Sequence, residues 1–315
     1  MVTAFTSGPV RVRVPATSAN LGPAFDCAGL ALARYDEIEV RVTASGLTVE
    51  VGGEGAGDLR RDERHLVVRA ARAAFDELGE QPPGLELRCT NAIPHGRGLG
   101  SSAAAIVGGV VAARALAGRT GDEATGRDAL ALAARLEGHP DNVAACLAGG
   151  LTFAWQGDVG IDTFRVDPHP RLEAVAVLPR ERVRTKAARG LLPVTVPHGD
   201  AAANAARATL LAPALAENPE LLLAATRDSL HQGYRRQAMP RTLELVDRLR
   251  AAGHAAVVSG AGPTVLVLGT ARMVPAAITV IEAVEPTWRV ERLQVDRTGT
   301  TLRAACAARI GGEEC

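Results

Sequence analysis

Eleven residues rich in glycine and serine form the segment of this 315-residue chain best suited to chemistry. They are Pro94, His95, Gly96, Arg97, Gly98, Leu99, Gly100, Ser101, Ser102, Ala103 and Ala104. The glycines let the backbone approach an anion closely, and a serine is expected to cap the helix that follows. The first amides of that helix carry a partial positive charge. The segment therefore predicts a site for the phosphates of a nucleotide.

Two common phosphate-binding motifs do not fit this segment. A Walker-type loop needs a lysine after its last glycine, but the only lysine, Lys186, follows no glycine-rich run. A dinucleotide-binding fold needs three glycines at a different spacing, and serines stand in the wrong place for it. We therefore expect another phosphate-binding chemistry at this loop.

The loop resembles the phosphate loop of the GHMP kinases, the family of galactokinase, homoserine kinase, mevalonate kinase and phosphomevalonate kinase. Residues 15–23 and 259–264 also match this family in the expected order, so the resemblance spans nearly the whole chain. It implies an α+β, two-lobed GHMP kinase fold. A ribosomal-protein-S5-domain-2-like N-terminal lobe (1–163) and a ferredoxin-like C-terminal lobe (164–315) would share one site.

Further segments resemble the homoserine kinases within that family: residues 24–32, 137–144, 185–193 and 231–240. The resemblance implies ATP-dependent phosphorylation of the hydroxyl of L-homoserine to O-phospho-L-homoserine, a step of threonine biosynthesis. It also implies Mg²⁺ held by Ser102 and Glu137, and a homodimer. His65 would lie near the adenine, at a position where relatives often carry asparagine.

Homoserine carries an ammonium, a carboxylate and a hydroxyl, and each group needs a different partner. Asp26 can accept a hydrogen bond from the ammonium, while Arg189 and Arg235 can bind the carboxylate through charge-assisted hydrogen bonds. Three uncharged or switchable side chains are suited to orient the hydroxyl: Asn20, His139 and Asn142.

These segments contain no evident catalytic base. Several GHMP kinases have an aspartate in the place of Asn142, and it is usually proposed to take the hydroxyl proton. We hypothesise that Asn142 only orients the hydroxyl and that the proton leaves to phosphate or water, because the transition state of such transfers is loose. We expect Asp141 to point away from the site. The catalytic residues implied by the resemblance are Ser102, Glu137 and Asn142.

Two alternatives stay open. The first is another small-alcohol kinase of the family, such as one acting on mevalonate, which lacks an ammonium; Asp26 with two arginines disfavours it. The second is a catalytically silent family member that binds a ligand as a regulator. Such a protein would be expected to have lost Glu137 or a loop serine, and both are present.

Composition limits the partners. The 35 basic and 35 acidic side chains cancel, so no net field attracts nucleic acid or an anionic membrane. Five widely spaced cysteines without metal-type or redox pairs favour a reducing compartment. The N-terminus lacks a signal-peptide pattern, and the longest apolar run, 103–113, is too short to span a bilayer. We expect a cytoplasmic protein with no nucleic-acid or membrane partner.

Hydrophobic periodicity predicts the elements that must position these residues. Apolar residues at helical spacing predict helices at 64–78, 101–117, 128–137, 201–215, 219–232 and 242–252. Alternating or short apolar runs predict strands at 10–14, 37–42, 47–51, 85–89, 149–155, 172–178, 255–258 and 265–268. Two of these strands, 47–51 and 85–89, are expected to pair with each other. Residues 158–170 are expected to be the passage between the lobes.

Overall fold

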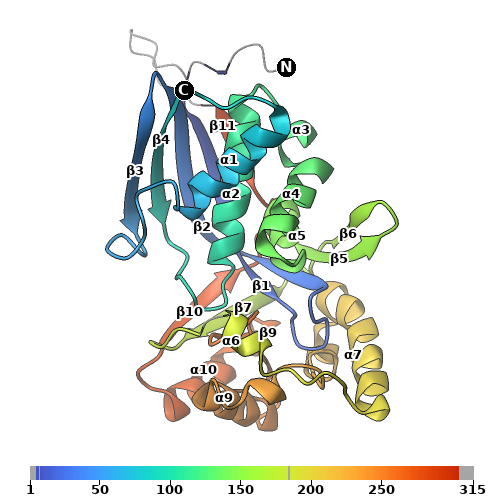
Figure 1. Ribbon diagram of the computed structural model, residues 1–315. Coiled ribbons are helices and arrows are strands. Elements are labelled where there is room, and N and C mark those ends of the chain that lie inside the picture. Colours follow the sequence, from blue (N-terminus) through green and yellow to red (C-terminus); the bar gives the residue numbers. More distant parts are fainter. Residues whose placement is uncertain (1–4, 7, 184, 305–315) are drawn as a thin grey trace.

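The chain folds around two β-sheets, one in each lobe (Figure 1). The computed structural model describes residues 5, 6, 8–183 and 185–304. In the first sheet the strand order is β11-β1-β2-β4-β3, with β5 paired to β2 and β6 to β5. Its strands are β1 (Val10–Ala19), β2 (Ala28–Thr43), β3 (Gly46–Gly53), β4 (Gly84–Asn91), β5 (Leu151–Gly157), β6 (Gly160–Val166) and β11 (Thr301–Ala304).

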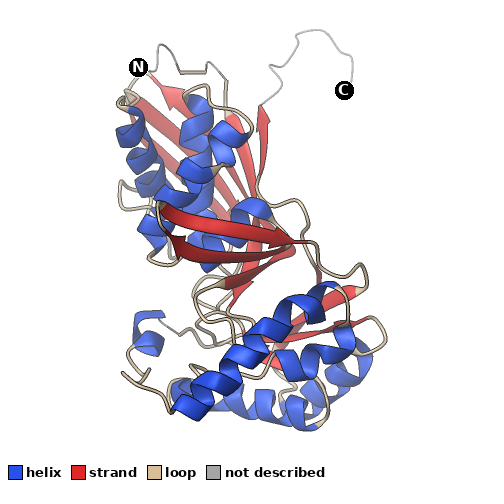
Figure 2. Ribbon diagram, turned by 90° about the vertical axis from the view of Figure 1, so that its right-hand side faces the viewer, coloured by secondary structure: helices blue, strands red, loops and turns tan. Residues whose placement is uncertain are grey.

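Helices cover one side of the first sheet (Figure 2). They are α1 (Leu66–Leu78), α2 (Ser101–Leu116), α3 (Asp122–Thr125), α4 (Arg127–Glu137) and α5 (Asp141–Ala148). The sheet turns its apolar side towards them because Val10, Val12 and Val14 are buried while the arginines between them are exposed.

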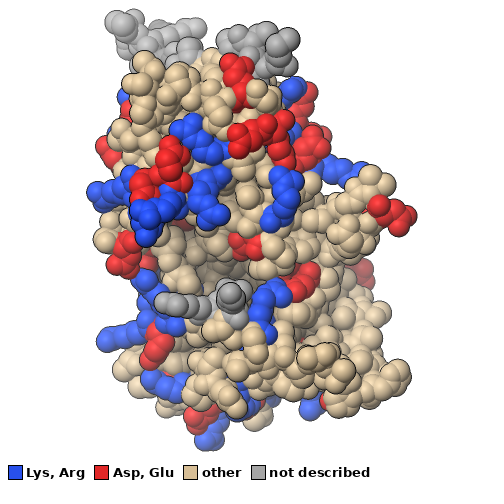
Figure 3. Space-filling model, viewed as in Figure 1, with Lys and Arg blue, Asp and Glu red and all other residues tan. Residues whose placement is uncertain are grey.

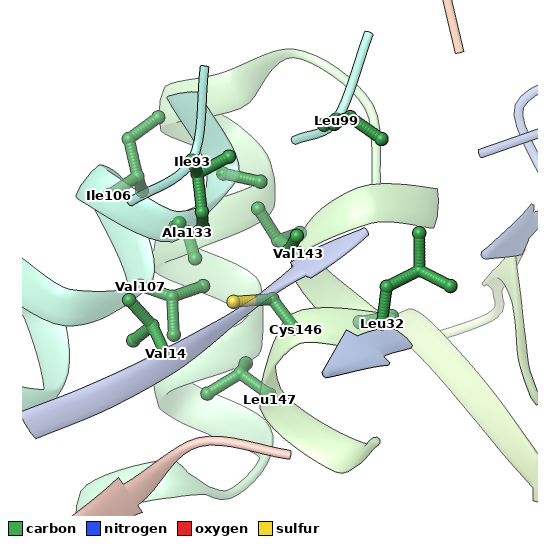
Figure 4. Close-up of a cluster of buried hydrophobic side chains, with 14 of the residues drawn as sticks. Val14, Leu32, Ile93, Leu99, Ile106, Val107, Ala133, Val143, Cys146 and Leu147 are labelled. Atoms are coloured by element: carbon green, nitrogen blue, oxygen red, sulfur yellow. The ribbon is translucent and has the colours of Figure 1, made fainter. Parts of the chain in front are cut away.

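Small residues let α2 lie deep in this lobe. A Cβ added to Gly108 would lie 2.2 Å from Ile38 Cδ1, and one added to Gly109 would lie 2.4 Å from the carbonyl oxygen of Val67 in α1. The helix is therefore buried on nearly all sides, which fixes the loop that precedes it. Figure 4 shows part of the core, where labelled side chains of α2, α5 and β1 meet.

The second sheet has the order β10-β7-β9-β8, and neighbouring strands are antiparallel. Its strands are β7 (Leu172–Leu178), β8 (Ala255–Val258), β9 (Val265–Thr270) and β10 (Arg289–Gln294). The helices of this lobe are α6 (Thr185–Arg189), α7 (His198–Ala216), α8 (Leu222–Ala225), α9 (Pro240–Ala251) and α10 (Val274–Val284). Helices between β7 and β8 and between β9 and β10 complete the ferredoxin-like succession of strands and helices.

Most of the predicted elements are confirmed, including β7 and β8 from end to end and the pairing of β3 with β4. Residues 219–232 are not one helix, because the Asp228 carboxylate accepts the backbone N–H groups of Leu230, His231 and Gln232 after α8 has ended. The predicted passage 158–170 contains strand β6, and α5 was not predicted.

The predicted boundary between residues 163 and 164 falls within β6. The chain passes from the first sheet to the second between β6 and β7, and β11 returns to pair with β1. The division at 163 stays a prediction.

Charged side chains of both signs are intermixed on the face drawn in Figure 3. In the described part of the chain no helix is long and apolar enough to cross a membrane. Cys27, Cys89 and Cys146 are free thiols, and Cys306 and Cys315 lie outside the described residues.

Candidate active site

A cavity of about 620 Å³ lies where segments of the two lobes meet. The first lobe contributes the turn after β1, the glycine-rich loop and the start of α5, and the second contributes residues near α6 and residues 260–262. All the side chains predicted to bind substrate or metal line this cavity: Asn20, Asp26, Ser102, Glu137, His139, Asn142, Arg189 and Arg235.

Nine of the eleven loop residues fall into two groups. Five of them line the cavity: Gly96, Gly98, Gly100, Ser101 and Ser102. Four are buried and anchor the loop in the core: Pro94, Leu99, Ala103 and Ala104. Arg97 donates to the carbonyl oxygen of Arg180 over 3.0 Å, and His95 lines a smaller neighbouring cavity of about 140 Å³ together with His65.

Glycine is required in this loop because other segments approach it closely. Gly98 and Gly100 have φ values of 77° and 72°. An added Cβ would lie 2.2 Å from the carbonyl oxygen of Ser259 at the first position and 2.0 Å from Thr17 Oγ1 at the second. The segments around Thr17 and Ser259 belong to the two other stretches that matched the GHMP kinases, and the structure brings all three together.

The expected serine cap of α2 is wrong. The residue before the helix is Gly100, in the left-handed conformation, and no described side chain caps it. Ser102 Oγ donates instead to Glu137 Oε1 over 2.5 Å. A serine cap would use one of the first amides of α2, and no described side chain does so here.

The neighbouring oxygens of Ser102 and Glu137 fit a magnesium ion. Hydroxyl and carboxylate oxygens are hard ligands, and Mg²⁺ keeps several of its waters, so two protein ligands are sufficient. Among the described residues, no three or more His, Cys, Asp or Glu side chains cluster as they would around a metal ion. Burial raises the pKa of Glu137, and the hydrogen bond from Ser102 opposes this shift.

Asp26 and Arg189 form a bidentate ion pair, with Nη1–Oδ2 at 2.8 Å and Nη2–Oδ1 at 2.5 Å. The guanidinium carbons of Arg189 and Arg235 lie 5.3 and 5.6 Å from the ring centre of Phe25. Arg235 is buried and donates to the carbonyl oxygen of Gly260 over 3.0 Å. Burial, and then the charge of Arg189, lower the pKa of Arg235. The cavity thus contains a carboxylate beside two arginines.

The turn after β1 presents Asp26. Asn20, Leu21 and Gly22 have φ values of 69°, 47° and 91°, so the chain reverses sharply there. Asn20 Oδ1 accepts from the amide of Asp26, and Asn20 Nδ2 donates to the carbonyl oxygen of Gly260, both over 3.0 Å. Asn20 therefore positions Asp26 within the protein, and its contact with a substrate hydroxyl stays a prediction.

Asp141 lines the cavity, so the expectation that it points away is wrong. It is buried, and its Oδ1 lies 2.6 Å from His139 Nδ1 and accepts from the amide of Asn142 over 2.7 Å. Burial lowers the pKa of His139, but the hydrogen bond and charge of Asp141 outweigh it, and the pKa is raised. Asn142 Oδ1 accepts from Thr17 Oγ1 over 2.7 Å.

Comparison with known proteins gives the family. Residues 65–150 match the GHMP kinases N terminal domain, and residues 202–280 match the GHMP kinases C terminal domain. The chain is 55% identical over 302 residues to a homoserine kinase from Streptomyces coelicolor, which covers 95% of this chain and 96% of the relative. The chain belongs to the GHMP kinase family. A homoserine kinase from Streptomyces avermitilis is 53% identical to this GHMP kinase over 303 residues, 95% of this chain and 97% of the relative.

A solved structure agrees with this assignment. The crystal structure of homoserine kinase from Cytophaga hutchinsonii superimposes with a TM-score of 0.83 at 26% identity, covering 94% of this chain and 98% of that one. The two-lobed GHMP kinase fold is therefore confirmed, and this GHMP kinase is an ATP-dependent kinase.

Besides Asp141, sequence reasoning missed two residues that line the cavity of this GHMP kinase and one that lies behind it. Thr17 contacts Asn142, and Arg182 and Val183 line the cavity beside the glycine-rich loop. The position of Thr17 within the matched stretch 15–23 was a usable signal. Arg182 is one of many arginines, and no motif in the neighbouring sequence marked it as a site residue.

Proposed function

We propose that this GHMP kinase transfers the γ-phosphoryl group of ATP to the hydroxyl of L-homoserine, giving ADP and O-phospho-L-homoserine in threonine biosynthesis. The bidentate pair of Asp26 and Arg189 carries the proposal. It places a carboxylate and a guanidinium in the same cavity as the glycine-rich loop. The similarity to proteins named homoserine kinase supports the same acceptor.

An amino acid complements this pair of charges. Its ammonium would bind Asp26, and its carboxylate would bind Arg189 and Arg235, both of which stack on Phe25. Mevalonate has a carboxylate but no ammonium, so it would leave Asp26 without a cationic partner of its own. The Asp26 side chain is only 32% exposed, so leaving its charge without a partner carries a cost, and this cost favours homoserine over mevalonate.

The nucleotide phosphates would lie against the glycine-rich loop and the start of α2. Ser102 and Glu137 would hold the magnesium ion, which supplies neutralisation of phosphate charge when bound. The smaller cavity beside the loop, lined by His65 and His95, would receive the adenine. Burial lowers the pKa of both histidines, so their rings are neutral at pH 7 and suited to contact a base.

In the transfer, a bond forms between the homoserine hydroxyl oxygen and the γ-phosphorus. The bond from that phosphorus to the β,γ-bridging oxygen breaks, and its electron pair leaves with ADP. Asn142 would orient the hydroxyl, because Thr17 occupies its Oδ1 and, among the described residues, its Nδ2 makes only one weak contact, 3.4 Å to Asp141. The hydroxyl proton would leave to phosphate or water.

The assembly and location are also proposals. The family resemblance supports a homodimer, and the free thiols of Cys27, Cys89 and Cys146 agree with a reducing, cytoplasmic compartment. Light scattering on a sizing column would give twice the mass of the chain if the dimer exists. A single-chain mass across micromolar concentrations would refute it.

Product analysis tests the proposed reaction. The protein would be incubated with ATP, magnesium and L-homoserine, and the products followed by phosphorus NMR and mass spectrometry. We expect one O-phospho-L-homoserine for each ADP. ADP formed without a phosphorylated amino acid, or no turnover at all, would contradict the proposal.

A further inference from the structure

A segment of the second lobe lies across the glycine-rich loop of the first. The amide of Val183 donates to the carbonyl oxygen of Gly96 over 3.3 Å, and Arg97 donates to the carbonyl oxygen of Arg180 over 3.0 Å. Between these two hydrogen bonds the stem of Arg182 lies beside Gly96, since a Cβ on that glycine would be 3.8 Å from Arg182 Cβ and Cδ. Arg182 therefore lines the cavity next to the loop.

The arginines of the cavity differ in how they are held. Arg189 is paired with Asp26, and Arg235 is buried against Gly260. The guanidinium of Arg182 contacts only Asp58 among the described residues, over 3.1 Å. Both partners are more than half exposed, at 55% and 65%, and an exposed ion pair of this kind is weak. Arg182 can therefore exchange Asp58 for a stronger anion.

Phosphoryl transfer needs positive charge around the phosphates. The glycine-rich loop has no lysine, and Ser102 and Glu137 contribute oxygens rather than cations. The charge of Arg182 also reaches the smaller cavity, where it is among the groups that lower the pKa of His95. Arg182 thus lines the cavity proposed for the phosphates, and its charge acts on a residue of the cavity proposed for the adenine.

We propose that Arg182 is a phosphate-binding residue, which leaves Asp58 and contacts the β- or γ-phosphate of ATP from the second lobe. This inference rests on the proposed nucleotide site and adds a cation to it. The hydrogen bonds from Val183 and Arg97 hold the segment on the loop, so only the end of the arginine side chain has to move. Guanidinium groups match phosphate oxygens in bidentate geometry.

The alternative is that Arg182 and Asp58 only join the two lobes. Binding of three nucleotides separates the two roles: AMP, ADP and a non-hydrolysable ATP analogue, each with magnesium and without homoserine, by titration calorimetry. Arg182→Gln and Asp58→Asn each break the ion pair, but only the first removes the cation. Arg180→Gln is the matched control, two residues away on the same exposed segment. Circular dichroism would verify that all variants are folded.

We expect Arg182→Gln to weaken binding of the ATP analogue by about tenfold, because a charge-assisted hydrogen bond is lost. Binding of AMP should weaken far less. Asp58→Asn should bind the analogue as tightly as the wild type or tighter, and Arg180→Gln should match the wild type. Three results would overturn the inference. Arg182→Gln and Asp58→Asn could weaken binding of the analogue equally, Arg182→Gln could weaken binding of all three nucleotides by the same factor, or it could leave binding unchanged. If the wild-type protein bound none of the nucleotides, the proposed function would fail as well.

Discussion

Asp26 and Arg189 meet as a bidentate ion pair although they are 163 residues apart in the sequence and lie in different lobes. Each is the proposed partner of one charge of the substrate amino acid. A zwitterion that enters between them can take over both contacts, so no charge is left unpaired in the cavity. The selection of an amino-acid acceptor thus depends on both lobes, because each lobe provides one member of the pair.

Removing the negative charge of this pair tests amino-acid recognition. Asp26→Asn should lower kcat/KM for L-homoserine by about tenfold or more, because a hydrogen bond to a charged group contributes about 1.5–3 kcal/mol. The KM for ATP should change little. With 4-hydroxybutyrate, which lacks the ammonium, wild type and variant should differ much less. A comparable loss with both acceptors would show that Asp26 acts only on the structure of the turn.

The paired oxygens of Ser102 and Glu137 predict a changed magnesium requirement. Glu137→Gln should require at least about tenfold more magnesium for half-maximal rate, because a charged ligand is replaced by a neutral one. Ser102→Thr keeps the hydroxyl and should retain more activity than Ser102→Ala. Magnesium titrations at saturating ATP measure both effects. Unchanged magnesium midpoints in Glu137→Gln would exclude it as a ligand.

The close approach at Gly98 predicts that alanine there is harmful. Its φ is 77°, and the new Cβ would lie 2.2 Å from the carbonyl oxygen of Ser259. Gly98→Ala should lower the free energy of unfolding by about 2 kcal/mol and weaken nucleotide binding. Gly57→Ala is the control, because no atom lies within 4 Å of its added Cβ. Denaturant unfolding that gave the same stability for both variants would refute the crowding argument.

A buried carboxyl predicts a pH effect on stability. Burial raises the pKa of Asp36 from 3.8 to about 6, although the amides of Ile93 and Ala92 donate to it. The fold favours the protonated form, so its stabilisation is present below about pH 4 and is lost as the pH rises through about 6. The sign is opposite to that of a carboxylate in a salt bridge.

Asp36→Asn keeps a hydrogen-bond acceptor for the two amides but does not titrate. Relative to the wild type, the variant should therefore gain up to about 3 kcal/mol of unfolding free energy between pH 4 and pH 7. Urea denaturation at several pH values measures this difference. Parallel curves for the two proteins would mean that folding does not shift the pKa of Asp36, and would contradict the prediction.

The sequence carried much of the fold but less of the site geometry. Helix α2 was predictable because its small apolar residues are continuous and end at Gly118. Helix α5 was not, because it has only 8 residues and begins directly after Pro140. The orientation of Asp141 depends on that helix, so its place in the cavity could not be predicted.

Pairings between distant residues were also beyond local reasoning. Ser102 and Glu137 could be named from the family motifs, but their 2.5 Å contact depends on how α2 packs against α4. Arg182 had no motif, and only the approach of its segment to Gly96 separates it from the other arginines.

A comparison of acceptor alcohols tests the central claim most directly. Rates of ATP-dependent ADP release would be measured with L-homoserine, mevalonate and galactose under the same conditions. The paired charges of Asp26 and Arg189 predict a high rate with L-homoserine and little above background with the other two. Activity on mevalonate or galactose, with none on L-homoserine, would contradict the account.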